Sequence, residues 1–129
     1  MLLVYDSIVR GTTSKKIIEL VRQAGATQVH FVSTCPPIRH ACFYGIDFPS
    51  ADELIAAGRD AHQIETALGA DRVIYLDIEG LRAALRAAAP ESGMTLPCMA
   101  CLDGKYPTDV AAAGGRFAAV RKSDRKGSV

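Results

Sequence analysis

The order of secondary structure expected at the start of the chain constrains its fold more than any other feature. Leu2–Tyr5 is a short apolar run that favours a strand, and Gln28–Ser33 is a second one. Between them, apolar residues recur at helical spacing up to Ala24, which predicts a helix. A strand, a helix and a strand joined by short connections are typical of a parallel β–α–β unit. The chain is therefore expected to have an α/β fold.

Residues that start and stop helices extend this prediction along the chain. Thr13 or Ser14 is placed to cap the first helix through its hydroxyl group, and Gly25 is placed to end it. The later expected elements are a helix over Glu53–Ala57 capped by Ser50 or Asp52, a helix over Ala61–Leu68 stopped by Gly69, a strand over Arg72–Leu76 and a helix over Ile78–Ala89 closed by Pro90. We expect residues 1–90 to form the α/β unit, 91–113 a loop-rich cysteine-bearing segment and 114–129 a disordered basic tail.

The composition indicates one small globular domain or a part of a larger one. The chain has 129 residues, of which 49% are hydrophobic, and its 15 basic and 14 acidic residues give a formal net charge of +1. A net charge this close to zero produces no overall electrostatic attraction for nucleic acid. Because the chain has no Trp, it also has few aromatic side chains on which bases could stack. No apolar run approaches the roughly 20 residues that span a bilayer, and the first residues lack the basic start of a signal peptide. We therefore expect a cytoplasmic protein that binds neither nucleic acid nor membrane.

The segment Leu2–Ser14 carries the clearest functional signal. An apolar strand ends in Asp6 and is followed by a turn rich in Ser, Gly and Thr and then by the start of a helix. Such a turn offers backbone N–H groups and the hydroxyl groups of Ser7, Thr12 and Thr13, and the helix adds the positive end of its dipole. Asp6 is placed to bind ribose hydroxyls or a hydrated Mg²⁺. This order of strand, acid, turn and helix start suits a phosphorylated sugar. The motifs of a P-loop and of a dinucleotide fold are both absent, so neither of those sites is expected.

Four cysteines form a second signal, and they are Cys35, Cys42 and the Cys-x-x-Cys pair Cys98 and Cys101. Nothing in the sequence indicates secretion, so a disulfide framework is not expected. In a cytosolic protein this pattern favours a metal or cluster site, because thiolates hold iron–sulfur clusters and also suit zinc.

Several separate segments resemble the amidophosphoribosyltransferases, the glutamine-dependent enzymes that commit carbon to purine synthesis. The run Asp-Ser-Ile-Val-Arg-Gly-Thr-Thr-Ser at positions 6–14 resembles their loop for 5-phosphoribosyl-1-pyrophosphate (PRPP). Pro36–His40, Cys42–Asp47 and Leu68–Asp71 continue the resemblance, and Cys98–Thr108 is similar to the C-terminal signature of the iron–sulfur branch. The resemblance implies the C-terminal half of a type I phosphoribosyltransferase domain, which is a Rossmann-like parallel sheet, followed by a loop-rich cysteine-bearing tail.

The resemblance also implies roles for individual residues. Asp6 would bind Mg²⁺ and the ribose, and the 5′-phosphate would be held by Ser7, Arg10, Gly11, Thr12 and Thr13. Three of the four ligands of a structural [4Fe–4S] cluster would be Cys42, Cys98 and Cys101, with the fourth supplied from upstream. Cys35 has no counterpart among these ligands; it is either an ordinary buried cysteine at a strand end or a substitute for the fourth ligand. No residue of this chain is assigned as a catalytic acid or base, because the reaction depends on positioning and on Mg²⁺.

Two departures from the family pattern bear on function. The family usually has two adjacent acids at the end of the first strand, and here the first of them is Tyr5. A phenol supplies neither the charge of a carboxylate nor its bidentate acceptor, so weaker sugar binding is expected unless Asp6 suffices. The glutaminase domain of the family and the first half of its transferase domain would lie before Met1. The isolated chain is therefore expected to be catalytically incomplete.

Two functions stay open from the sequence. In the first, the chain is part of an amidophosphoribosyltransferase, which forms 5-phosphoribosylamine from PRPP and glutamine-derived ammonia. It would act in a homo-oligomer with the missing N-terminal half or with a partner chain that supplies that half. In the second, it is a non-catalytic module that binds phosphoribosyl compounds or nucleotides. A half-domain would also leave an unpaired sheet edge and exposed apolar surface, which favours association with a partner.

Overall fold

The computed structural model describes residues 1–46, 48, 50–88, 90 and 97–110. The elements are β1 (Leu2–Tyr5), α1 (Thr12–Gln23), β2 (His30–Ser33), the 3₁₀ helix η1 (Ala51–Glu53), α2 (Ala61–Leu68), β3 (Arg72–Tyr75), α3 (Ile78–Ala88) and α4 (Ala100–Asp103). The expected basic tail at 114–129 lies outside the described residues, as do Asp47, Ala89 and residues 91–96 and 111–113. Among the described helices, none is long and apolar enough to cross a membrane.

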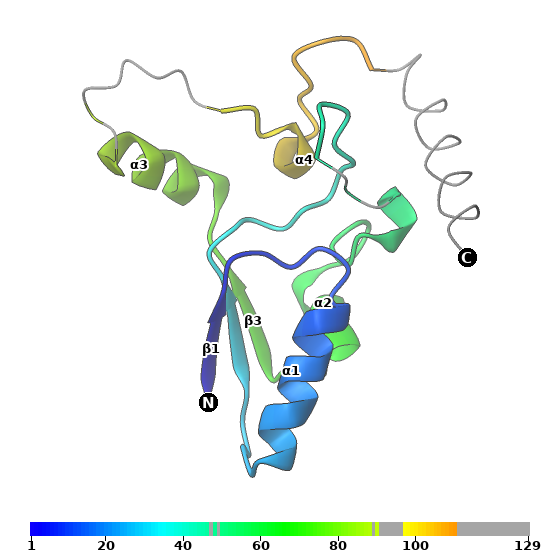
Figure 1. Ribbon diagram of the computed structural model, residues 1–129, viewed down its shortest axis with the longest axis vertical. Coiled ribbons are helices and arrows are strands. Elements are labelled where there is room, and N and C mark those ends of the chain that lie inside the picture. Colours follow the sequence, from blue (N-terminus) through cyan, green and yellow to red (C-terminus); the bar gives the residue numbers. More distant parts are fainter. Residues whose placement is uncertain (47, 49, 89, 91–96, 111–129) are drawn as a thin grey trace.

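The strands form one parallel sheet in the order β1-β2-β3 (Figure 1). The register pairs Val4 with Val32 and Val32 with Ile74. Helix α1 connects β1 to β2 and runs back along the sheet, as the β–α–β prediction requires (Figure 1). All three strands point in the same direction, so the loops that follow them meet at one end of the sheet. The expected α/β class with a parallel sheet is confirmed.

The first core lies between one face of the sheet and helices α1 and α2. Phe31 of β2 is completely buried and Val73 of β3 is 6% exposed, and they pack with Ile8, Ile18, Val29, Ile55, Ala56, Ile64 and Leu68. Alternate residues of a strand point to opposite faces. Val4 and Ile74 therefore face the other way, and they are 61% and 46% exposed. Parallel sheets are usually covered on both faces, but within the described residues this second face is open.

The second core lies beyond the carboxyl ends of the strands and consists of Ile38, Leu54, Met99 and Leu102. It joins the loop after β2, the end of η1 and the short helix α4, which Figure 1 shows above the sheet. Because these residues come from segments far apart in the sequence, the second core fixes the cysteine-bearing segment against the loop after β2.

The start of α1 differs from the expectation. The helix begins at Thr12, its N-cap is Gly11, and no side chain caps it. Thr13 and Ser14 are therefore not the cap, and Ser14 is buried in the first turn at 2% exposed. Gly11 has φ +79, and the ends of the Ile55 and Leu68 side chains pack so close to it that a Cβ atom would clash. A left-handed glycine is thus required here by both backbone conformation and packing.

The expected helix over Glu53–Ala57 is wrong. The 3₁₀ helix η1 ends at Glu53, and Leu54 has extended backbone with φ −72 and ψ 123. Leu54 is completely buried in the second core, and the N–H of Ile55 donates to the carbonyl of Val9 at 2.8 Å. These tertiary contacts hold the backbone out of the helical conformation.

Two other differences are local. Residues 100–103 form α4 where a loop is expected, because four residues are too few to show a helical period. Helix α2 has the predicted bounds Ala61–Leu68, but its capping box, in which Asp60 and Gln63 bond each other's backbone N–H groups, is not part of the prediction. Gly69 ends α2 in the left-handed conformation with φ +75, which confirms the predicted stop.

Candidate functional site

A cleft of about 450 Å³ opens beside the loop that joins β1 to α1. All six residues predicted to bind the sugar phosphate line it, and these are Asp6, Ser7, Arg10, Gly11, Thr12 and Thr13. The structure adds five lining residues, which are Tyr5, Val9, Ser14, Ile46 and Phe48. The fold therefore brings the predicted residues together at the carboxyl end of β1.

The first turn of α1 supplies backbone donors to this cleft. The N–H of Lys15 is the first in the helix to find a backbone partner, the carbonyl of Gly11 at 2.8 Å. The N–H groups of Thr12, Thr13 and Ser14 precede it and have no intrahelical acceptor. The positive end of the helix dipole lies at the same place. This combination of free amides and dipole suits a phosphate or another compact anion.

Asp6 stands where β1 ends, and its neighbour Tyr5 differs from it in chemistry. The Oδ1 atom of Asp6 accepts the N–H of Ser7 at 2.5 Å, which orients the carboxylate at the strand end. Among the described residues that line the cleft, Asp6 is the sole carboxylate. Tyr5 is 38% exposed, and its ring centroid lies 6.0 Å from that of Phe31. The described part of the cleft thus offers one carboxylate and one phenol for a sugar or a cation.

Arg10 reaches the rim of the cleft in an ion pair. Its Nε atom lies 2.8 Å from Oε2 of Glu53, and the two side chains are 42% and 38% exposed. Glu53 also accepts the hydroxyl of Ser50 at 3.1 Å. The pair joins the loop after β1 to η1 at the edge of the cleft, and it occupies the Arg10 guanidinium with a carboxylate.

The apolar side of the cleft is absent from the predicted site. Ile46 and Phe48 line the cleft together with the polar loop, although they follow β2 rather than β1. Their signal in the sequence is weak: two large apolar residues inside a loop that contains Gly and Pro. Only the fold shows that this loop turns back toward the end of β1.

The four cysteines occupy one region near the second core. Cys42 is buried, Cys35 and Cys101 are half-buried, Cys98 is exposed, and none forms a disulfide. The carbonyl of Cys101 accepts the N–H groups of Arg39 and His40, each at 3.0 Å. Burial raises the pKa of the Cys101 thiol, and the nearby thiolates of Cys42, Cys35 and Cys98 raise it further. The fold therefore gathers the three predicted cluster ligands, with Cys35 nearby.

The side chains in this region limit the kind of metal centre that they could hold. Within the described ranges, no three His, Cys, Asp or Glu side chains are placed to hold a single metal ion. The donors in this region are thiols, which is the chemistry of an iron–sulfur cluster, whose ligands each bind a different iron atom. The donor chemistry of this region is thus compatible with a cluster.

The chain is similar in sequence to amidophosphoribosyltransferases from several lineages. It is 44% identical over 110 residues to the enzyme of Bacillus subtilis and 46% identical over 110 residues to that of Methanocaldococcus jannaschii. These matches cover 85% of this chain but 23% and 22% of the relatives. A chloroplastic amidophosphoribosyltransferase of Vigna aconitifolia is 44% identical over 107 residues. No known family profile matches the chain.

The fold is also similar to a solved structure. Glutamine phosphoribosylpyrophosphate amidotransferase from B. subtilis, complexed with ADP and GMP, matches with a TM-score of 0.72 and 44% sequence identity. This match covers 84% of our chain and 24% of that one. The chain thus spans about a quarter or less of the length of the relatives it matches. Over these residues the chain is similar to a C-terminal part of the amidophosphoribosyltransferases, and its parallel α/β sheet has their type I phosphoribosyltransferase fold.

Proposed function

We propose that this chain is part of an amidophosphoribosyltransferase that forms 5-phosphoribosylamine from PRPP and glutamine-derived ammonia. Within it, the loop Asp6–Thr13 would bind the ribose 5-phosphate part of PRPP. The observation that carries this proposal is the cleft of about 450 Å³, on which all six predicted residues converge at the start of α1. The family relationship adds the reaction, because relatives with 44–46% identity are named for it.

The 5′-phosphate would bind at the first turn of α1. The N–H groups of Thr12, Thr13 and Ser14 and the hydroxyls of Ser7, Thr12 and Thr13 would donate to its oxygens, and Arg10 would add positive charge from the rim. Hydrogen bonds to a charged group contribute about 1.5–3 kcal/mol each. Several such bonds at a helix N-terminus are sufficient for specific binding of a phosphate monoester.

Asp6 would bind the ribose hydroxyls and Mg²⁺. A bound Mg²⁺ ion commonly has one or two carboxylate ligands together with substrate oxygens, so Asp6, the single carboxylate among the described lining residues, fits it. When bound, the ion stabilises the negative charge of the departing pyrophosphate. Tyr5 contributes no second charge, so Asp6 carries this role within the described part of the cleft.

Cys42, Cys98 and Cys101 would be three of the ligands of a structural [4Fe–4S] cluster. The gathering of thiols beside the second core supports this proposal. Iron and acid-labile sulfide should both be found in anaerobically purified protein and should be lost in the Cys42→Ser variant. Zinc without sulfide would contradict the cluster and indicate a zinc site instead.

The missing part of the enzyme would complete the sheet. It would contain the glutaminase domain and the first half of the transferase domain, and it would precede this segment on the same chain or lie on a partner chain in a homo-oligomer. Leu2 and Val4 on the edge strand β1 are each 61% exposed, and Ile74 is 46% exposed. An open apolar face of this kind favours burial against further structure.

Two experiments test the proposal. Calorimetric titration of the chain with PRPP and Mg²⁺ should show saturable binding, and the Asp6→Asn variant should bind more weakly. A chimera in which this chain replaces the corresponding part of the B. subtilis enzyme should release pyrophosphate from PRPP in the presence of glutamine. Absence of binding to the chain, together with an inactive but folded chimera, would overturn the proposal.

A further inference from the structure

A set of tyrosine contacts ties the cysteine-bearing segment to the loop after β2. The hydroxyl groups of Tyr44 and Thr108 lie 2.6 Å apart, and the N–H of Thr108 donates to the same phenol oxygen at 3.2 Å. The hydroxyl of Tyr106 donates to the carbonyl of Ala41 at 2.5 Å, and its ring centroid lies 5.0 Å from that of Phe43. We call Tyr44, Tyr106 and Thr108 the clasp.

The clasp lies close in sequence to the apolar wall of the cleft. Ile46 follows Tyr44 by two residues, and its carbonyl accepts the N–H of Phe48 at 2.8 Å. Ile46 and Phe48 are apolar residues that line the cleft, and we call them its apolar wall. Ile46 is 54% exposed, so burial contributes little to its position. A tether at Tyr44 therefore constrains where this wall stands.

The second core contacts the same wall through Phe48. Phe48 and Val9 both line the cleft, and both pack against the second core. That core contains Met99 and Leu102, which flank Cys101 in the sequence. Two independent sets of contacts, the clasp and the second core, thus connect the cysteine-bearing segment to the wall of the cleft.

The two sides of the cleft differ in the chemistry that they can bind. The loop side has amides, hydroxyls and the Arg10 guanidinium, which suit a phosphate group. The wall of Ile46 and Phe48 is apolar and suits the carbon skeleton of a sugar. A change in the position of the wall should therefore alter binding of the sugar and leave binding of the phosphate almost unchanged.

We propose that the clasp residues are positioning residues for the sugar. Through Ile46 and Phe48 they determine the affinity of the cleft for the ribose part of its ligand, without contacting the ligand themselves. This inference rests on the proposed function, because it requires that the cleft binds a sugar phosphate. The cysteine-bearing segment would thus contribute to sugar binding, although it lies far from the phosphate loop in the sequence.

The test uses variants that remove one hydroxyl each. Thr108→Val loses the hydroxyl and keeps the shape of the side chain, whereas Thr108→Ser keeps the hydroxyl; Tyr106→Phe loses the donor to Ala41. Tyr75→Phe is the matched control, because the buried hydroxyl of Tyr75 has no hydrogen-bond partner in the described structure. Each variant of the 129-residue chain is titrated separately with ribose 5-phosphate and with inorganic phosphate, and its melting temperature is measured.

Thr108→Val and Tyr106→Phe should weaken binding of ribose 5-phosphate about three- to fivefold, which is the effect of losing contact with about one methylene group. Their affinity for inorganic phosphate should match that of the wild type, as should both affinities of Thr108→Ser and Tyr75→Phe. Unchanged affinity for ribose 5-phosphate would overturn the proposal, and so would equal weakening of both ligands, which indicates general damage to the fold. A wild-type chain that binds neither ligand would refute the proposed function itself, and this inference with it.

Discussion

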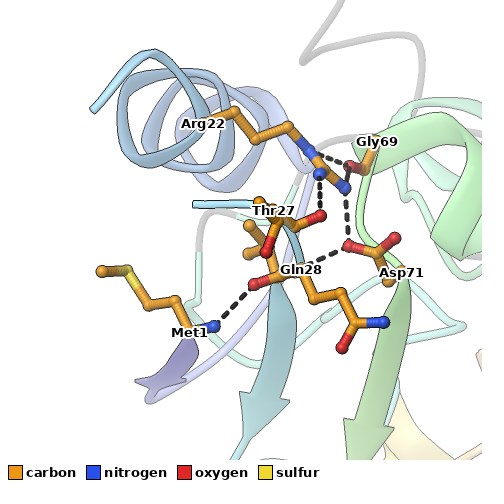
Figure 2. A network of polar contacts seen from close by, with 7 residues as sticks. Met1, Arg22, Thr27, Gln28, Gly69 and Asp71 are labelled. Carbon is orange, nitrogen blue, oxygen red and sulfur yellow. Dashed lines mark hydrogen bonds and ion pairs between the residues drawn. The ribbon is translucent and has the colours of Figure 1, made fainter. Parts of the chain in front are cut away.

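The two ends of the sheet are built in opposite ways. At the amino end, polar groups pair with one another (Figure 2). Arg22 at the end of α1 donates to the carbonyl of Gly69 at 2.9 Å and pairs with Asp71 at 2.7 Å, and Asp71 also accepts the N–H of Val29 at 2.7 Å. The amino group of Met1 donates to the carbonyl of Gln28 at 2.5 Å. At the carboxyl end, the amides at the start of α1 and the carboxylate of Asp6 line an open cleft instead.

This difference separates polar groups that hold the fold from polar groups that face a ligand site. Arg22 and Asp71 join α1, the start of β2 and the start of β3, so their contacts stabilise the layers of the fold. The amides of Thr12 to Ser14 have no intrahelical acceptor, and their hydrogen-bonding capacity is available to a bound anion. Substitutions at the two ends should therefore have different consequences, and the following predictions are given in order of decreasing effect.

The largest effect is expected at Gly11, for which Gly25 at the other end of α1 is a matched control. Both have positive φ, +79 and +101, but a Cβ atom on Gly11 would overlap Ile55 and lie 2.8 Å from Leu68 Cδ2, whereas a Cβ atom on Gly25 would meet open space. Gly11→Ala should lower the free energy of unfolding by about 3 kcal/mol, from backbone strain and overpacking together. Gly25→Ala should cost about 1 kcal/mol, from strain alone. Urea unfolding measures both, and equal losses would show that packing does not constrain Gly11.

The next effect is a gain of affinity at Tyr5. Tyr5→Asp places a second carboxylate beside Asp6, and a hydrogen bond or ion contact with a charged group should strengthen Mg²⁺-dependent binding of PRPP about tenfold. The variant should also lose some stability, because it removes the ring contact with Phe31. Tyr5→Asn is the control, since it has a similar size to Asp and no charge. If calorimetry shows the same gain for Asn as for Asp, charge is not the cause.

The stabilising contacts at the amino end of the sheet should be lost at acidic pH. The N–H of Val29 and the guanidinium of Arg22 hold the pKa of the Asp71 carboxyl below its usual value. The pKa of the Glu65 carboxyl is also lowered, mainly by the hydrogen bond from the N–H of Val73 and to a smaller extent by the charge of Arg72. A lowered pKa in the folded state means that the stabilisation is fully present above the unfolded value of about 4 and is lost as the pH falls through the lower folded value.

Asp71→Asn removes that titration without changing the size of the side chain. Its melting temperature should be a few degrees below that of the wild type at pH 7, and the difference should shrink toward pH 3. A difference that stays constant over this range would show that the charge of Asp71 contributes nothing to stability.

Features that depend on residues close together in the sequence can be predicted from the sequence, whereas features that depend on contacts between distant residues cannot. The strands and α1, α2 and α3 were predicted, because their periodicity and stop signals are local. The cap at Gly11 is not predicted from the sequence, because the Ile55 and Leu68 side chains that leave no room for a Cβ atom there lie far along the chain. For the same reason the candidate site was predicted only on its polar side. The wall of Ile46 and Phe48 depends on how the loop after β2 folds over the second core.

The smallest effect is expected from the ion pair on the rim of the cleft. Glu53→Gln removes the charge that pairs with Arg10 at 2.8 Å, and exposed ion pairs contribute only about 0.2–1 kcal/mol. Affinity for ribose 5-phosphate should therefore rise by no more than about twofold, because Arg10 gains freedom to face the phosphate. Calorimetry at low salt measures this change. A large loss of affinity would show instead that Glu53 holds Arg10 in its binding position.

The central claim is that the start of α1 binds a phosphorylated sugar while the opposite end of the sheet serves only the fold. Nuclear magnetic resonance of the ¹⁵N-labelled chain, titrated with ribose 5-phosphate, tests both halves of this claim in one experiment. We predict saturable shifts for the amides of Gly11, Thr12 and Thr13 and no shifts for those of Val29 and Asp71. Saturable shifts confined to Val29 and Asp71, or the absence of any shift at Gly11 to Thr13, would contradict the account.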